Sequence, residues 1–165
     1  YDYGLTWELA GRVGSPTTRL EPEEPAMAVL QNGSVLLNLR DALGSHRRWE
    51  VLSTDSGESF GEPWETSVIG PTSNAALITL ASGQVVLANP RSTTARVNLS
   101  LYSLNQDSIG TSREWNYIKT LTLGGSAYVT STRVASPFAV GLLFETGSDT
   151  NPYNSINYMI VNTTR

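Results

Sequence analysis

The sequence has no cysteine and only one histidine, His46, among its 165 residues. Without cysteine there is no disulfide and no thiolate that could act as a nucleophile or bind a metal. A single histidine also argues against a multi-histidine metal centre. No apolar run is long enough to span a membrane, and a net charge of -4 lacks the basic excess of a nucleic-acid binder. We therefore expect no metal, no cofactor, no nucleic-acid partner and no membrane span.

The sequence also lacks a convincing helical pattern. Short apolar runs rich in valine, leucine and tyrosine are separated by turn residues every eight to twelve positions, which is typical of antiparallel all-β folds. An apolar content of 39% is enough for a core. We expect residues 1–165 to form part of one domain. The strands are expected at 26–30, 35–39, 48–54, 74–80, 85–89, 97–103, 115–123, 127–134, 139–145 and 155–161.

A short motif of aspartate, glycine, a hydroxyl residue and an aromatic residue recurs along the chain. It ends at Trp7, at Phe60 and, in a looser copy, at Trp115, so the copies are 53 and 55 residues apart. A repeat of this length is typical of propeller blades. In each copy the aspartate is expected to accept backbone N–H groups, the glycine to take a positive φ, and the aromatic ring to pack into the blade.

The strongest hairpin signal is Asn32-Gly33 between two apolar runs, which predicts a two-residue type I′ turn. This register would place Glu24 opposite Asp41 and beside Arg40. Asp41 is then expected to do no more than orient Arg40.

Three hairpins can be aligned on their turns at Asn32-Gly33, Ser82-Gly83 and Ser136-Pro137. Polar residues then occupy equivalent positions: Glu24, Asn74 and Tyr128 before the turns, and Arg40, Pro90 or Arg91, and Glu145 after them. Equivalent ends of the inner strands of a propeller surround one central depression. We therefore expect Glu24, Asn74 and Tyr128 to face one concave site, with the Tyr128 hydroxyl within hydrogen-bond reach of Glu24. The turn at Ser136-Pro137 also places Tyr128 directly opposite Glu145.

These segments together resemble the exo-sialidases, also called neuraminidases, over nearly the whole chain. The resemblance lies in EPAMAVLQNGSVLLNLR from Glu24, in ANPRSTTARVNLSL, in GGSAY and GLLFE, and in the two aspartate motifs. It implies a six-bladed β-propeller to which this chain supplies about three antiparallel blades, the C-terminal half. The implied partners are a sialylated glycan substrate and the missing N-terminal half of the propeller. That half would hold the acid/base aspartate and the first arginine of a triad.

The resemblance also implies a role for each candidate. Tyr128 would be the nucleophile and Glu24 its general base, while Arg40 and Arg96 would be two members of the arginine triad. Glu145 would steady the third arginine. Asn74 is added as a substrate-binding residue by the hairpin spacing and not by the resemblance. A neutral phenol suits a substrate that carries a carboxylate at its reacting carbon, and sialidases are the tyrosine exception to the two-carboxylate rule. Arginine forks bind such a carboxylate in a bidentate way.

Several alternatives remain open at this point. Glu23 competes with Glu24 and Arg91 with Arg96, and Tyr128 would also suit a plain strand position. Three further arginines are expected on the surface and His46 in a loop: Arg47, Arg48 and Arg133. A non-catalytic sialic-acid-binding or structural propeller is the alternative to the enzyme, and a trans-sialidase is a third. Sequons at Asn32, Asn98 and Asn162 favour a secreted or lumenal protein.

Overall fold

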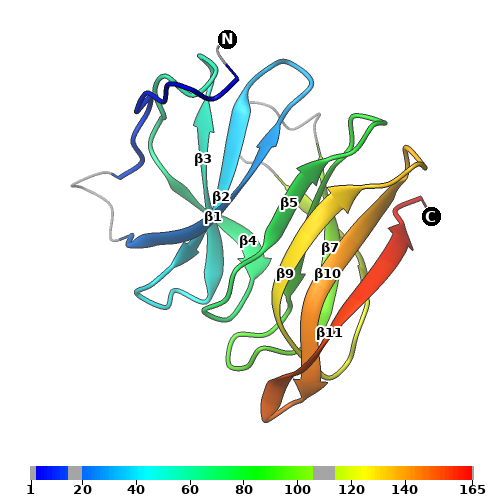
Figure 1. Cartoon of the computed structure of the whole chain (residues 1–165). Coiled ribbons are helices and arrows are strands. Elements are labelled where there is room, and N and C mark those ends of the chain that lie inside the picture. Colours follow the sequence, from blue (N-terminus) through cyan, green and yellow to red (C-terminus); the bar gives the residue numbers. More distant parts are fainter. Residues whose placement is uncertain (1–2, 15–19, 106–113, 165) are drawn as a thin grey trace.

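The computed structural model describes residues 3–14, 20–105 and 114–164, and within these ranges all regular structure is β-strand. The strands form three antiparallel sheets (Figure 1). The first sheet contains β1 (Pro22–Val29), β2 (Val35–Asp41), β3 (Arg47–Ser53) and β4 (Trp64–Ile69), and the second contains β5 (Ala76–Thr79), β6 (Val85–Pro90), β7 (Leu99–Leu104) and β8 (Trp115–Thr120). The third contains β9 (Gly125–Arg133), β10 (Ala139–Ser148) and β11 (Asn151–Asn162). This is the arrangement expected of three consecutive propeller blades.

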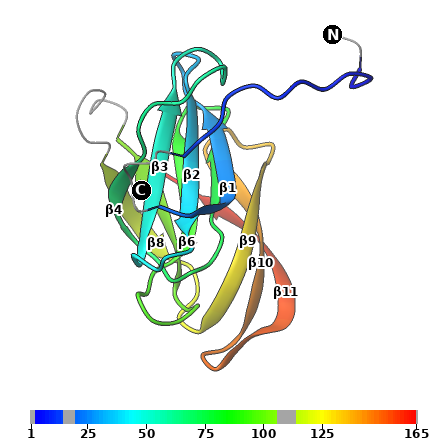
Figure 2. The same cartoon turned by 90° about the vertical axis from the view of Figure 1, so that its left-hand side faces the viewer.

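The second sheet lies between the other two, and both of its faces are covered (Figures 1 and 2). Strand β6 shows how the sequence achieves this, because its apolar side chains alternate between two cores. Val85 and Leu87 pack against the first sheet, while Val86 and Ala88 pack against the third. All four are at most 1% exposed. Such a continuous apolar run is what a strand buried on both faces requires.

The first strand of each sheet lies next to the first strand of the following sheet, in the order β1, β5, β9. A hydrogen bond links β5 to each neighbour: the Thr79 hydroxyl donates to the Val29 carbonyl at 2.6 Å, and Arg133 Nε donates to the Thr79 carbonyl at 2.9 Å. Because the three inner strands are neighbours in this order, their equivalent ends lie on the same side of the structure, as predicted.

The predicted two-residue turn at Asn32-Gly33 is wrong. Leu30 and Ser34 pair at the end of a three-residue loop, in which only Gly33 has a positive φ, of 85°. The Asn32 side chain accepts the Ser34 N–H at 3.1 Å, so the asparagine stabilises the turn through its side chain. The second hairpin closes in the same way at Gly83, which also has a φ of 85°.

Because the loop has three residues rather than two, the register of the first hairpin also differs from the predicted one, in which Glu24 lay opposite Asp41. Glu23 lies opposite Arg40 and Pro22 opposite Asp41, and the pairing shifts by one residue between Glu23 and Ala26. Glu24 is in this irregular stretch and has a φ of 42°, which is uncommon for a residue other than glycine. A β-bulge at the end of an edge strand commonly redirects a side chain.

The turn of the second aspartate motif folds as its sequence predicts, whereas its aromatic residue, Phe60, is only half-buried and lies outside both core clusters. The Asp55 carboxylate accepts the Ser59 N–H at 2.9 Å and the Ser53 hydroxyl at 2.6 Å, and Gly57 has a φ of 96°. In the first motif, however, the Trp7 side chain is 89% exposed rather than packed into a blade. In the third, Trp115 is buried, whereas Asp107, Gly110 and Ser112 lie outside the described residues.

Two further differences concern single elements. Strand β4, with the sequence WETSVI, was not expected, because three consecutive polar residues, 65–67, interrupt the apolar pattern of a strand. The expected surface position of Arg48 is wrong, since this side chain is 1% exposed, whereas Arg47, Arg133 and His46 are exposed as expected. No helix capable of crossing a membrane occurs within the described ranges.

Candidate active site

The three sheets meet at one of their ends, and the candidate site lies there. Its centre is the contact between Tyr128 and Glu24. The Tyr128 hydroxyl donates a hydrogen bond to Glu24 Oε1, although the two residues are 104 positions apart. The two side chains are therefore within hydrogen-bond reach of each other, as predicted. Tyr128 comes from β9 in the third sheet and is 37% exposed, while Glu24 comes from the bulge of β1 in the first. A tyrosine beside a carboxylate has the geometry of a nucleophile with its base.

Arg40 binds the same carboxylate from the neighbouring strand. Its Nη1 lies 3.0 Å from Glu24 Oε1, and its Nε lies 3.5 Å from Glu23 Oε2. The side chain of Glu24 is 28% exposed and that of Glu23 is 48% exposed, so Glu24 is the more enclosed of the two. Of the two glutamates, Glu24 is the partner of Tyr128, because it accepts the hydrogen bond from the Tyr128 hydroxyl.

Arg96 lies over the ring of Tyr128. Its Cζ is 5.2 Å from the centroid of that ring and 6.0 Å from the centroid of Tyr153. Its Nη2 donates to the Thr72 carbonyl at 2.7 Å and its Nη1 to the Tyr153 hydroxyl at 2.8 Å. Arg91, the rival candidate, lies over Tyr117 at 5.0 Å instead. The guanidinium group next to Tyr128 is therefore that of Arg96.

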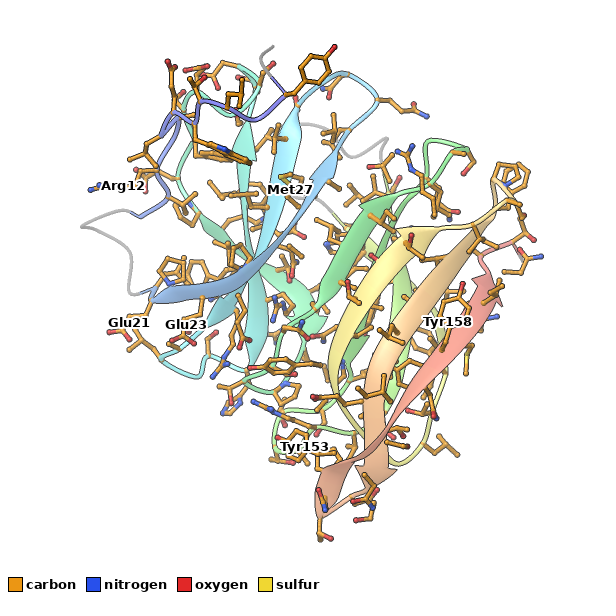
Figure 3. The ribbon with its side chains drawn as sticks, in the orientation of Figure 1. Arg12, Glu21, Glu23, Met27, Tyr153 and Tyr158 are labelled. Carbon is orange, nitrogen blue, oxygen red and sulfur yellow. The ribbon has the colours of Figure 1, made fainter. Side chains whose placement is uncertain are left out.

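Tyr153 was not identified from the sequence. It lies near the start of β11, which was expected to begin only at Ser155, and its contact with Arg96 spans 57 positions. Figure 3 shows Tyr153 at the same end of the sheets as Glu21 and Glu23, with Met27 and Tyr158 farther along their strands. No local pattern could have identified this contact, because Arg96 lies in the loop between β6 and β7 and Tyr153 lies 57 positions away on β11.

Glu145 and Asn74 bind the backbone around Tyr128. Glu145 Oε2 accepts the N–H of Tyr128 itself at 3.0 Å, at the point where the β9–β10 pairing shifts its register. The expected direct pairing of these two residues is therefore replaced by a side-chain contact. Asn74 binds Val129 through both ends of its amide group, with distances of 2.9 and 3.1 Å.

A pocket of about 180 Å³ lies against Tyr128. Of the predicted residues, Asn74, Tyr128 and Glu145 line it, and its remaining wall is largely apolar, with Leu143 and Ile156. Glu24 and Arg96 contact Tyr128 directly and Arg40 contacts Glu24, but none of these three residues lines the pocket. The described residues contain no group of histidine, cysteine, aspartate and glutamate side chains suited to a metal ion.

The electrostatics of the pair follow from these contacts. The hydrogen bond to Glu24, together with partial burial, raises the pKa of Tyr128, against the charges of Arg96 and Arg40. For Glu24, burial raises the pKa, but the hydrogen bonds from Tyr128 and Arg40 and the two arginine charges outweigh it, so the pKa is lowered. Tyr128 is thus a neutral phenol and Glu24 an ionised acceptor. The arrangement can move a proton from the phenol to the carboxylate.

A buried polar network extends behind the site. Arg48 Nε donates to Asn38 at 2.8 Å, Asn38 donates to Glu50 at 3.1 Å, and the indole of Trp115 donates to Glu50 at 2.8 Å. Burial lowers the pKa of Arg48 to about 10, while the charges of Glu24 and Glu50 act in the opposite direction, so the guanidinium stays charged at neutral pH. Arg48 is buried because these carboxylates compensate its charge.

Comparison with known proteins agrees with this architecture. Residues 1–139 match the family described as the BNR repeat-like domain. The chain belongs to this family. A sialidase of Micromonospora viridifaciens is 30% identical to this BNR repeat-like chain over 157 residues, which cover 89% of the chain and 23% of the relative. The chain therefore spans about a quarter of the length of this relative.

Solved structures show the same fold. The NanB sialidase from Streptococcus pneumoniae has a TM-score of 0.80 at 21% identity, with 98% of this chain and 26% of that chain covered. The intramolecular trans-sialidase from Ruminococcus gnavus has a TM-score of 0.73 at 18% identity, with 98% and 36% covered. A protein of unknown function from Dyadobacter fermentans has a TM-score of 0.75 at 18% identity, with 98% and 43% covered. The BNR repeat-like chain thus has the sheet arrangement of sialidase propellers.

Proposed function

We propose that this chain supplies the nucleophile and part of the substrate carboxylate site of an exo-α-sialidase, which hydrolyses terminal sialic acids from glycoproteins, glycolipids or oligosaccharides. The observation that carries the proposal is the hydrogen bond from the Tyr128 hydroxyl to Glu24, with Arg40 and Arg96 beside it. The likeness to a sialidase at 30% identity supports it. The proposal concerns the protein that carries these residues, because the chain spans about a quarter of that relative.

The geometry favours catalysis over simple binding. A site that only binds a carboxylate needs positive charge, which the two arginines supply, and it gains nothing from a phenol bonded to a carboxylate. The raised pKa of Tyr128 means that the resting site holds a phenol rather than a phenolate. Attack on the anomeric carbon must therefore be accompanied by transfer of the phenolic proton to Glu24.

The chemical step proposed for these residues is a displacement at the anomeric carbon. A bond forms between Tyr128 Oη and that carbon while the bond to the leaving oxygen breaks, and the phenolic proton moves to Glu24. The leaving oxygen takes the electron pair of the broken bond and needs a proton from an acid, which we assign to the missing N-terminal half of the propeller. A water molecule then forms a bond to the anomeric carbon while the bond from that carbon to Tyr128 Oη breaks. The water gives its proton to the acid that protonated the leaving oxygen, and Glu24 returns its proton to the phenolic oxygen.

The test is the substitution Tyr128→Phe in the protein that carries this chain. Phenylalanine keeps the ring against Arg96 but removes the attacking oxygen, so hydrolysis of an aryl sialoside should fall by about 10²-fold or more, as for the loss of other catalytic groups. Tyr117→Phe is the matched control, because Tyr117 is also a ring under an arginine but lies away from the site. Equal turnover in the two variants would refute the assignment of the nucleophile.

A further inference from the structure

The strand that carries Tyr128 is an edge strand of the third sheet, and side chains from the segment that precedes β5 satisfy that edge. The sheet order is β11-β10-β9, so β9 has a neighbouring strand on one side only. The Ser73 hydroxyl donates to the Ala127 carbonyl at 3.3 Å. Asn74 Nδ2 donates to the Val129 carbonyl at 3.1 Å, and Asn74 Oδ1 accepts the Val129 N–H at 2.9 Å. The backbone of both neighbours of Tyr128 is therefore held by the side chains of Ser73 and Asn74.

The Asn74 amide makes the contacts that a paired strand would make. An amide carries one acceptor and one donor group, and here both are directed at the backbone of a single residue, Val129. Two reciprocal bonds fix the orientation of the amide as well as its distance from β9. Buried backbone groups need such partners, and Val129 is 3% exposed. This geometry differs from that of a side chain free to bind a substrate.

The segment that bears these side chains is itself fixed to the rest of the site. The Ser73 carbonyl accepts a 2.7 Å hydrogen bond from Nη1 of the buried Arg48, which comes from the first sheet. The Thr72 carbonyl accepts a 2.7 Å hydrogen bond from Nη2 of Arg96. Three consecutive residues, 72–74, thus join the strand of Tyr128 to the sheet of Glu24 and to Arg96.

We infer that Ser73 and Asn74 are positioning residues, which hold the backbone of β9 so that the Tyr128 hydroxyl stays in contact with Glu24. The inference rests on the proposed function and changes the role expected of Asn74 from substrate contact to support of the nucleophile. A reacting group displaced by about 1 Å can cost up to about 10²-fold in rate, so a small movement of β9 is sufficient.

The experiment compares Asn74→Leu with Thr79→Val in the protein that carries this chain. Leucine has a volume similar to that of asparagine but can make neither bond to Val129. Thr79→Val is the matched control, because it removes a hydrogen bond from β5 to the backbone of Val29, which involves neither Tyr128 nor Val129. The measured quantities are kcat and KM for an aryl sialoside, together with the pKa of Tyr128 from NMR of ring-labelled tyrosine. The Tyr128 signal is assigned by its loss in Tyr128→Phe.

Asn74→Leu should lower kcat by roughly 10- to 100-fold with a much smaller change in KM, and the Tyr128 pKa should fall toward its ordinary value as contact with Glu24 is lost. Thr79→Val should change neither quantity. An increase in KM alone would identify Asn74 as a substrate contact and overturn the inference. So would a loss of thermal stability with an unchanged kcat and an unchanged Tyr128 pKa.

If Asn74→Leu does not fold, Ser73→Ala decides the question, because it removes only the bond to Ala127 and should lower both kcat and the Tyr128 pKa. Unchanged values in Ser73→Ala would then reject the inference. A wild-type protein that hydrolyses no sialoside would refute the proposed function, and the NMR titration would still decide whether these two residues hold Tyr128 against Glu24.

Discussion

Arg96 offers the most direct test of how this site would bind a carboxylate. Its guanidinium group uses two nitrogens to hold its own position, with donor–acceptor distances of 2.7 Å to Thr72 and 2.8 Å to Tyr153. The plane of the group is thereby fixed beside Tyr128, and its remaining N–H groups are available to a ligand. A lysine at this position has one ammonium group, which cannot keep both bonds and also present a fork to a carboxylate.

The expected loss can be worked out from these contacts. Arg96→Lys should remove at least one charged hydrogen bond to the substrate, which contributes about 1.5–3 kcal/mol. At 1.36 kcal/mol for each factor of ten, this corresponds to a decrease of roughly 10- to 150-fold in kcat/KM. Because the carboxylate is present in both the bound substrate and the transition state, most of the change should appear in KM.

The assay is steady-state hydrolysis of an aryl sialoside, with Arg91→Lys as the control. Arg91 also lies over a tyrosine ring, at 5.0 Å from Tyr117, so this variant reproduces the loss of an arginine–aromatic contact away from the site. Thermal melting of both variants shows whether the fold is retained. A KM for Arg96→Lys equal to that of Arg91→Lys would refute the assignment of Arg96 to the carboxylate site.

Two further predictions concern pH. Arg40 lowers the pKa of Glu24 through a hydrogen bond and its charge, so Arg40→Gln should raise that pKa and move the acidic limb of the kcat/KM profile to higher pH; an unmoved limb would mean that Glu24 is not the base. Hydrogen bonds from Ser53 and Ser59 lower the pKa of Asp55 from 3.8 to about 2. This carboxylate therefore stabilises the fold above pH 3.8, and the contribution is lost as the pH falls toward 2. Asp55→Asn should flatten the pH dependence of thermal stability over that window.

The regular parts of the fold could be predicted from the sequence, because alternation and turn residues determine them. Strand β6 is an example, since a continuous apolar run between two turn signals has few other uses in a chain of short strands. The contact between Glu24 and Tyr128 could also be predicted, because the hairpins are spaced evenly enough to be aligned on their turns. The exact register could not, since Asn32 and Gly33 are compatible with either a two-residue or a three-residue loop.

The buried charge of Arg48 lay beyond such reasoning. A charged residue in a strand normally marks the solvent face, and only the three-dimensional structure shows that Glu50 and Asn38 reach the same interior position. The alternation of the strand does place Arg48 and Glu50 on one side, two residues apart. That pattern indicates a paired buried charge only together with Asn38 on the neighbouring strand, which the sequence alone does not place there.

The functional residues lie where the strand pairing is irregular, and this irregular pairing is also what the sequence could not predict. Glu24 stands in a β-bulge with a φ of 42°, and Glu145 contacts Tyr128 where the β9–β10 pairing shifts. A residue in a sparsely populated conformation costs of order 1–3 kcal/mol and persists where the surrounding structure holds it. In the observed register Glu23 takes the position opposite Arg40, which leaves Glu24 free to accept hydrogen bonds from both Arg40 and Tyr128. With regular pairing through this stretch, Glu24 itself would lie opposite Arg40 and its carboxylate would be tied to the first sheet. The irregular end of β1 is therefore what allows a carboxylate of the first sheet to reach the phenol of the third.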